Sequence, residues 1–416
     1  MDSVTRLFLE ALRAALQRER VDWELALSPY DWQRLFRLAE EHHVLPMVYE
    51  AVFRCPAAEQ GERELFQAVR RRTLQSVALQ TGKTDAFLRL YGRLREAGVR
   101  ACVVKGIVCR SLYPKPDYRM SGDEDVLIPA EQFRLCHEVL LCAGMSPKDG
   151  EAGIDEAFEV SYGKAGSPLY LELHKSLFAP DSESYGDLNR FFDRVTDRLT
   201  EFLVPGGEIL TMPATDHLLY LILHALKHFL HSGFGIRQVC DICLFANAFG
   251  AEIDWQYLLR CCREVHGELF AAALFRIGER YLTFRPEEAH YPAEWRQLAV
   301  DEGPMLEDLL AGGAYGDSSM SRKHSSGITL SAVSAEKQGK KAGGHVLRTI
   351  FPRAKALEGR FPYLKKHPIL LPVAWASRIV KYGWETGGKL EKEAAQSVQI
   401  GNRRIELLRQ YGILRK

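Results

Sequence analysis

Residues 121–128 read SGDEDVLI, a turn of small residues followed by two aspartates that open an apolar run. Side chains alternate between the two faces of a strand, so Asp123 and Asp125 are expected on one face and Glu124 on the other. Neighbouring carboxylates repel each other unless a cation lies between them. At an all-oxygen site the usual cation is Mg²⁺, which often carries the phosphates of a substrate. The stretch therefore predicts a metal-dependent enzyme that acts on phosphate esters.

A two-metal site of this kind usually takes a third carboxylate from a neighbouring strand. The best candidate is Glu172, because alternation along the run Leu169–His174 places Glu172 and His174 on the same face. The alternative is that Glu172 lies on a solvated outer face. Its position downstream of the two aspartates favours the metal site.

A second group of residues is expected to bind phosphate. Lys105 and Gly106 stand where a strand is predicted to turn into a helix. Glycine lets the backbone approach a phosphate closely, and the N-terminus of the new helix offers N–H groups to an anion. Lys105 would then pair with the outer phosphates, and Ser121 belongs to the same predicted set. Arg119 has two interpretations that the sequence leaves open, contact with phosphate or pairing with Asp117.

The helix predicted after residue 213 carries four histidines that fall within about 60° of one another on an ideal helix, His217, His224, His228 and His231. This helix is apolar nearly all round, which predicts that it is buried. It lacks the glutamate of the H-E-x-x-H motif, which argues against a zinc protease. Three interpretations remain. The histidines are hydrogen-bonded core residues, or they bind zinc in another way, or His224, Lys227 and His228 line a cleft opposite the carboxylates and contact triphosphate or acceptor.

The following helical stretch contains two regularly spaced pairs. Arg237 and Asp241 are four residues apart, the spacing of an ion pair on a helix surface, and a place in the lining of the site is the alternative. Cys240 and Cys243 have redox or zinc-knuckle spacing. They lie within a helical pattern, and the sequence contains no second C-x-x-C, so we predict a structural role for them.

Composition and charge exclude several classes of protein. The chain has 416 residues, 46% of them hydrophobic and 26% charged, as in ordinary soluble proteins with two or three domains. A net charge of +1 argues against a protein that coats nucleic acid. The first twenty residues form an amphipathic pattern rather than a signal peptide, and the apolar stretch 218–230 is too short to span a bilayer. We expect a cytoplasmic location and no membrane partner.

Hydrophobic periodicity divides the chain into helical and strand-rich parts. It predicts helices over 4–18, 31–41, 62–96, 106–112 and 130–142. Strand-rich runs occupy 101–104, 124–128, 157–162, 168–174 and 201–204. Strands that alternate with helices and then follow one another indicate an α/β or α+β sheet domain. The predicted organisation is a helical region 1–80, a catalytic domain 81–205, a helical domain 206–312, a flexible Gly/Ser/Lys-rich loop 313–344 and a helical region 345–416. A basic lid that orders over phosphates is the alternative for 313–344.

Taken in order, these motifs resemble the uncharacterised bacterial nucleotidyltransferase family of the DNA polymerase β-like superfamily. The resemblance runs from about residue 30 to residue 390. The motifs that carry it are Lys105-Gly106, Leu112-Tyr113-Pro114, Arg119, Asp123-x-Asp125-x-Leu127, Glu172-Leu173-His174, His224 to His228, Arg237-x-x-x-Asp241, Phe351-Pro352 and Arg360-Phe361-Pro362-Tyr363-Leu364.

The resemblance implies an α+β fold, a small mixed sheet with helices on one side and helical regions around it. It also implies that Asp123, Asp125 and Glu172 hold Mg²⁺, with Mn²⁺ as a substitute. Two positions depart from the superfamily pattern. Lys-Gly replaces the usual Gly-Ser or Gly-Gly turn, and the third acid is Glu rather than Asp. Because both acids supply hard oxygens, the metal argument is unchanged.

The implied reaction is an in-line displacement at the α-phosphorus of a nucleoside triphosphate. An acceptor hydroxyl or phosphate attacks, Glu172 accepts its proton, and pyrophosphate leaves, while positioning and charge neutralisation supply most of the catalysis. The neutral net charge favours a small-molecule or peptide acceptor. The alternatives are a tRNA acceptor, as in toxin-type nucleotidyltransferases, transfer of the γ-phosphate, and a catalytically inactive nucleotide-binding module.

Overall fold

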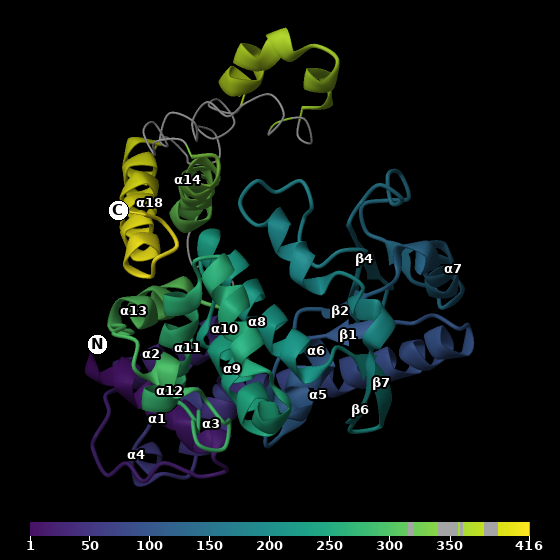
Figure 1. The fold of residues 1–416 in the computed structure, drawn as a ribbon. Coiled ribbons are helices and arrows are strands. Elements are labelled where there is room, and N and C mark those ends of the chain that lie inside the picture. The colour runs from purple at the N-terminus through teal and green to yellow at the C-terminus, as the bar shows by residue number, and fades with distance from the viewer. Residues whose placement is uncertain (315–319, 340–356, 358–360, 378–389, 416) are drawn as a thin grey trace.

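The structure, a computed structural model, describes residues 1–314, 320–339, 357, 361–377 and 390–415 (Figure 1). Its α-helices are α1 (Ser3–Leu16), α2 (Pro29–Glu41), α3 (Leu45–Val52), α4 (Pro56–Glu59), α5 (Arg63–Glu96), α6 (Gly106–Ser111), α7 (Phe133–Cys142), α8 (Ala214–Leu230), α9 (Ile236–Phe249), α10 (Trp255–Glu264), α11 (Glu268–Tyr281), α12 (Ala293–Arg296), α13 (Gly303–Gly312), α14 (Met320–Lys337) and α18 (Leu390–Gln410). The 3₁₀ turns are η1 (Pro116–Tyr118), η2 (Ala130–Gln132), η3 (Gly186–Phe192), η4 (Val195–Arg198), η5 (Gly250–Glu252), η6 (Pro362–Lys365) and η7 (Pro368–Leu370).

The described residues contain a mixed sheet of seven strands. The strands are β1 (Cys102–Val104), β2 (Glu124–Leu127), β3 (Ser146–Pro147), β4 (Glu159–Gly163), β5 (Tyr170–His174), β6 (Thr200–Val204) and β7 (Gly207–Thr211). Their order is β3-β4-β5-β2-β1-β7-β6, and the β2–β5 and β1–β7 pairs are parallel while the others are antiparallel. The fold is therefore α+β, as predicted.

The five predicted strand-rich runs coincide with β1, β2, β4, β5 and β6, whereas β7 was assigned to the helical region. The turn at Pro205 to Gly207 is a hairpin, and Gly206 adopts φ +92°, which only glycine takes up without strain. β7 then pairs with β1, so the sheet continues to Thr211, beyond the predicted domain end at residue 205. β7 has five residues and its alternation is weak, so the helical pattern that follows it concealed it.

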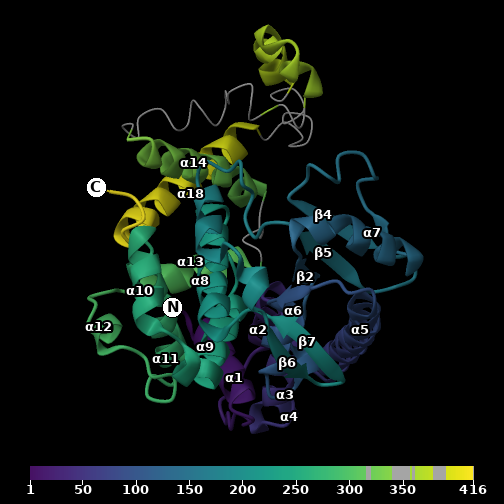
Figure 2. The ribbon, with the colours of Figure 1, turned by 45° about the vertical axis from the view of Figure 1, so that its right-hand side comes forward.

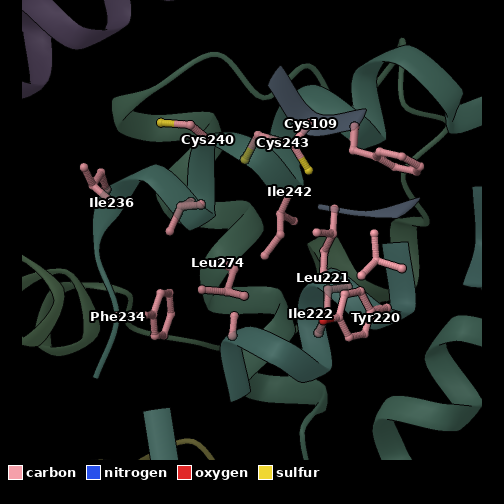
Figure 3. Close-up of a cluster of buried hydrophobic side chains, with 14 of the residues drawn as sticks. Cys109, Tyr220, Leu221, Ile222, Phe234, Ile236, Cys240, Ile242, Cys243 and Leu274 are labelled. Carbon is pink, nitrogen blue, oxygen red and sulfur yellow. The ribbon is translucent and has the colours of Figure 1, made fainter. Parts of the chain in front are cut away.

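Helices cover the sheet on both sides, because α8 and α9 of the following helical region add a second layer to the one side of helices that the resemblance implies (Figure 2). In Figures 1 and 2 the sheet stands between α5 and the pair α8–α9. On the α5 side, the Tyr91 hydroxyl donates to the Ala101 carbonyl and accepts from the Leu210 N–H. On the other side, Cys109 of α6 lies in one apolar cluster with Cys240 and Cys243 of α9 (Figure 3). The catalytic sheet and the following helices thus share one core.

Cys240 and Cys243 are free, fully buried thiols in that core. Burial raises the pKa of both, which keeps them protonated and unreactive. The predicted structural role of the C-x-x-C pair agrees with this environment.

The predicted flexible loop 313–344 is wrong for most of its length, because 320–337 forms α14. This helix packs against α18 and α8. Its buried face includes several small and branched residues at helical spacing, Ser325, Ile328, Thr329, Ala332 and Val333. The Thr329 hydroxyl donates to the Leu230 carbonyl at 2.6 Å. The helix therefore needs few large apolar residues, which is why its composition resembles that of a loop.

Parts of the remaining predictions fall outside the described residues. They are residues 315–319 and 340–344 of the predicted loop, together with Phe351, Pro352 and Arg360 of the resemblance. In the predicted helical region 345–416, the structure describes η6, η7 and α18. Among the described helices, none is both long enough and apolar enough to cross a bilayer.

Candidate active site

The acidic side of the site comes from two adjacent parallel strands. In the register of β2 and β5, Asp125 lies beside Glu172 and Leu127 beside His174. The side chains of Asp125, Glu172 and His174 therefore extend from the same face of the sheet, and ligand atoms of all three lie within 4.8 Å of one another. Asp123, two residues before Asp125, borders the same cavity.

Asp125 lies at the centre of this acidic group and is almost fully buried. Its Oδ2 is 3.0 Å from the Lys105 Nζ, and its Oδ1 is 3.1 Å from the His174 Nε2. Burial alone would raise the pKa of Asp125, but the Lys105 charge and the His174 hydrogen bond hold it below the usual range. Burial alone would lower the pKa of Lys105, but the negative charge of Asp125 outweighs burial and raises it. Both groups are therefore charged at neutral pH.

The other two carboxyls are held close to like charges. Burial and the charge of Asp125 raise the pKa of Asp123. Burial, Asp125, Asp123 and Glu159 together raise the pKa of Glu172 to about 7. Acids that crowd one another in this way are suited to a divalent cation, which would supply the missing positive charge. Carboxylate oxygens suit Mg²⁺, and the nearby His174 nitrogen extends the fit to Mn²⁺.

The Lys105-Gly106 turn at the start of α6 has an unusual backbone. Lys105 adopts φ +55°, and Gly106 adopts φ +25°. A Cβ at Gly106 would lie 2.0 Å from Oε2 of Glu124. That carboxylate accepts the Ile107 N–H at 2.8 Å and pairs with Arg110 at 2.7 Å. Glycine is required here by Glu124, and the expected open helix N-terminus is partly taken up by this carboxylate.

The basic side of the site comes from α8. His224 Nε2 lies 3.0 Å from the Lys105 Nζ and 3.2 Å from the His228 Nε2. Burial and the charges of Lys105 and Lys227 lower the pKa of both histidines well below the usual value, so both rings are neutral. Burial also lowers the pKa of Lys227, which lines the cavity beside them. Basic side chains thus border the same cavity as the carboxylates.

The remaining two histidines of the predicted face have other surroundings. His217 is fully buried and accepts the Lys105 backbone N–H at 3.2 Å, while its Nδ1 lies 3.1 Å from the Thr211 Oγ1. His231 follows the end of α8 and contacts the ring of Tyr185 at 5.3 Å between centroids. His217 matches the predicted hydrogen-bonded core histidine, whereas His224 and His228 line the cavity.

Arg119 forms an ion pair that neither of its two predicted roles anticipated. It is buried and donates to both oxygens of Asp241, at 2.6 and 3.1 Å. Asp117 instead accepts a hydrogen bond from Thr81. Of the two interpretations of Arg237 and Asp241, the surface pair is wrong, because both residues are buried, Asp241 pairs with Arg119 and Arg237 donates to the Met120 carbonyl. The alternative agrees with the structure, since both residues border the cavity. The ion pair ties α9 to the loop that leads into β2.

One cavity of ≈ 240 Å³ is bordered by every residue that the sequence assigned to the site. These residues are Lys105, Gly106, Arg119, Ser121, Asp123, Asp125, Glu172, His224, Lys227, His228 and Arg237.

Among the lining residues that sequence reasoning missed, three are titratable, namely Glu159, His174 and Tyr220. His174 was placed on the correct face but was given no role. Glu159 lies opposite His174 in the β4–β5 register, 3.5 Å from its Nδ1, and no local signal predicts which strands pair. Tyr220 precedes His224 by one helical turn, a spacing that could have revealed it.

The fold and this site define a nucleotide-transferring enzyme. A mixed sheet presents acidic residues on two adjacent strands, and basic side chains border the same cavity. Residues 28–283, more than half of the chain, match the model of an uncharacterised nucleotidyltransferase family. The chain belongs to that family and is a transferase with a nucleotide substrate. No curated protein and no solved structure matches it.

Proposed function

We propose that this enzyme transfers a nucleoside monophosphate from a nucleoside triphosphate to a small-molecule or peptide acceptor, with Mg²⁺ held by Asp123, Asp125 and Glu172. Mn²⁺ is the alternative ion. The observation that carries the proposal is that an acidic wall and a basic wall line one cavity. The acidic wall consists of the carboxylates of β2 and its neighbour β5, and the basic wall consists of Lys227 and of Lys105, which also contacts Asp125 at 3.0 Å.

Each wall has a distinct task in this reaction. The bound cation would neutralise the phosphates and hold them in line with the acceptor. Lys105 and Lys227 would take the outer phosphate oxygens, with Arg237 beside them. Lys105 now contacts Asp125 at 3.0 Å, so its ammonium has to pass from that carboxylate to the phosphates as substrate enters.

Glu172 is the proposed proton acceptor. Its pKa of about 7 lies close to neutral pH, where a general base is most effective. Asp125, whose pKa is lowered, remains ionised and is suited to hold the cation together with Asp123 and Glu172. The two carboxyls lie side by side in the register, so proton transfer and charge neutralisation would occur at adjacent positions.

The test uses ATP labelled at either the α- or the γ-phosphate, incubated with the protein, Mg²⁺ and the small-molecule, peptide and RNA fractions of a cell extract. Asp125→Asn is the control. The proposal expects transfer of the α-label to the small-molecule or peptide fraction, abolished in the variant. Transfer of the γ-label alone would identify a phosphotransferase and refute the proposal.

The other outcomes separate the remaining alternatives. Labelling of RNA, with acceptor binding that falls steeply as salt rises, would identify a tRNA-type acceptor. If no label is transferred from any of the four nucleoside triphosphates and Mg²⁺-nucleotide does not raise the melting temperature, the chain is an inactive module.

A further inference from the structure

The loop that carries Asp123 accepts hydrogen bonds from a buried lysine of α5. Lys83 is 8% exposed, and its Nζ donates to the Ser121 carbonyl at 2.5 Å and to the Gly122 carbonyl at 2.7 Å. Its neighbour Gln80, 1% exposed and one turn earlier, accepts the Ser121 N–H at 2.9 Å. Buried lysines are rare and costly unless they are paired, so this position needs an explanation.

The preceding carbonyl of the same loop accepts a hydrogen bond from another helix. Arg237 of α9 donates to the Met120 carbonyl. Three successive carbonyls, those of Met120, Ser121 and Gly122, therefore accept hydrogen bonds from two cations on two different helices. The residue that follows them is Asp123.

The charges around this loop explain why such a clamp is useful. Asp123 lies close to Asp125, and burial together with this like charge raises its pKa. A flexible loop would let Asp123 turn away from Asp125. Lys83 opposes this in two ways, since it fixes both preceding peptide groups and its positive charge attracts Asp123 and Glu124.

We infer that Lys83 is a positioning residue, which orients Asp123 by clamping the loop before it together with Arg237. The inference rests on the proposed function, because it assigns Asp123 to the metal. Lys83 itself lies outside the lining of the cavity and would act only through the backbone.

The test compares Lys83→Met, which keeps the apolar stem and removes the charge, with Arg89→Met. Arg89 also lies on α5, but its side chain is 69% exposed and pairs with Asp85. In Lys83→Met we expect kcat for α-label transfer to fall about 10- to 100-fold, with a smaller change in KM for the nucleotide. Hydrogen exchange in the segment 119–125 should accelerate about tenfold. Arg89→Met should match the wild type in both.

A conservative replacement separates positioning from simple packing. Lys83→Arg keeps the charge and the donors, so it should recover part of the rate and of the protection from exchange. Gln80→Met removes one hydrogen bond and no charge, and it replaces Lys83→Met as the test variant if that variant does not fold. It should show a smaller loss of kcat, with faster hydrogen exchange in the same segment.

Normal kcat and normal exchange in folded Lys83→Met would overturn the inference, as would a lower melting temperature with unchanged kcat. The exchange measurement requires no activity. A wild-type chain that transfers no α-label refutes the proposed function, while the exchange difference between Lys83→Met and Arg89→Met still decides whether Lys83 clamps the loop.

Discussion

The two walls of the cavity are built in different ways. The acidic wall is part of a sheet, where main-chain pairing fixes Asp125 beside Glu172. The basic wall is built from long side chains, those of Lys227 on α8 and of Lys105 just before α6. A sheet holds like charges together at short distance against their repulsion, whereas flexible lysines can follow a substrate. We therefore expect a rigid set of carboxylates that holds the metal and a set of mobile lysines that binds phosphate.

The largest effect is expected when a negative charge is removed from the acidic wall. Asp125→Asn keeps the volume of the side chain, and we expect α-label transfer to fall about 10³-fold or more, because charge stabilisation at the reacting phosphate is lost. Single-turnover kinetics with labelled nucleotide would measure this. A loss of less than tenfold in a folded variant would mean that Asp125 is not a metal ligand.

A second prediction concerns the buried ion pair that joins α9 to the loop before β2. Arg119→Met leaves Asp241 buried without its cation, and we expect a loss of about 3 kcal/mol in the free energy of unfolding. Denaturant unfolding would measure it. Adding Asp241→Asn should recover part of the loss, since the stranded charge is then gone. An Arg119→Met variant as stable as the wild type would show that the ion pair does not join α9 to that loop.

The protonation of Glu172 gives a prediction for stability as a function of pH. Its pKa is about 7 in the folded protein against 4.5 as the ordinary value, so the folded state binds more protons between these limits. The contribution of Glu172 to the free energy of unfolding is therefore fully present below pH 4.5 and is lost as pH rises through 7.

The measurement is the unfolding free energy of the wild type minus that of Glu172→Gln, without metal, from pH 5 to pH 8. The difference should fall by roughly 2 kcal/mol. Subtraction removes the opposite contribution of His224 and His228, whose lowered pKa favours the folded state as pH rises. A difference that stays constant with pH would exclude a raised pKa at Glu172.

The smallest effect on the reaction is expected when one lysine of the basic wall is replaced. Lys227→Met should raise KM for the nucleoside triphosphate about tenfold, with kcat little changed, because one of several phosphate contacts is lost. Steady-state kinetics at fixed Mg²⁺ would show it, with Lys337→Met of α14 as a control outside the cavity. If kcat falls and KM does not, Lys227 acts on the transition state, and the two walls are less different than proposed.

The sequence alone determined which residues share a face. A period of two placed Asp123 with Asp125 and Glu172 with His174, and a period near 3.6 placed His224 with His228, because these patterns follow from backbone geometry within a single element. The predicted roles of these residues stay predictions, and so do the predicted domain limits other than the end at residue 205 and the loop 313–344.

Only the tertiary structure decided which elements meet. β2 pairs with β5 across more than forty residues of chain, Arg119 pairs with Asp241, and Lys83 reaches the carbonyls before Asp123. The helix α14 likewise depends on the surfaces of α8 and α18. Such contacts arise from packing and register between distant segments, and local periodicity carries no information about them.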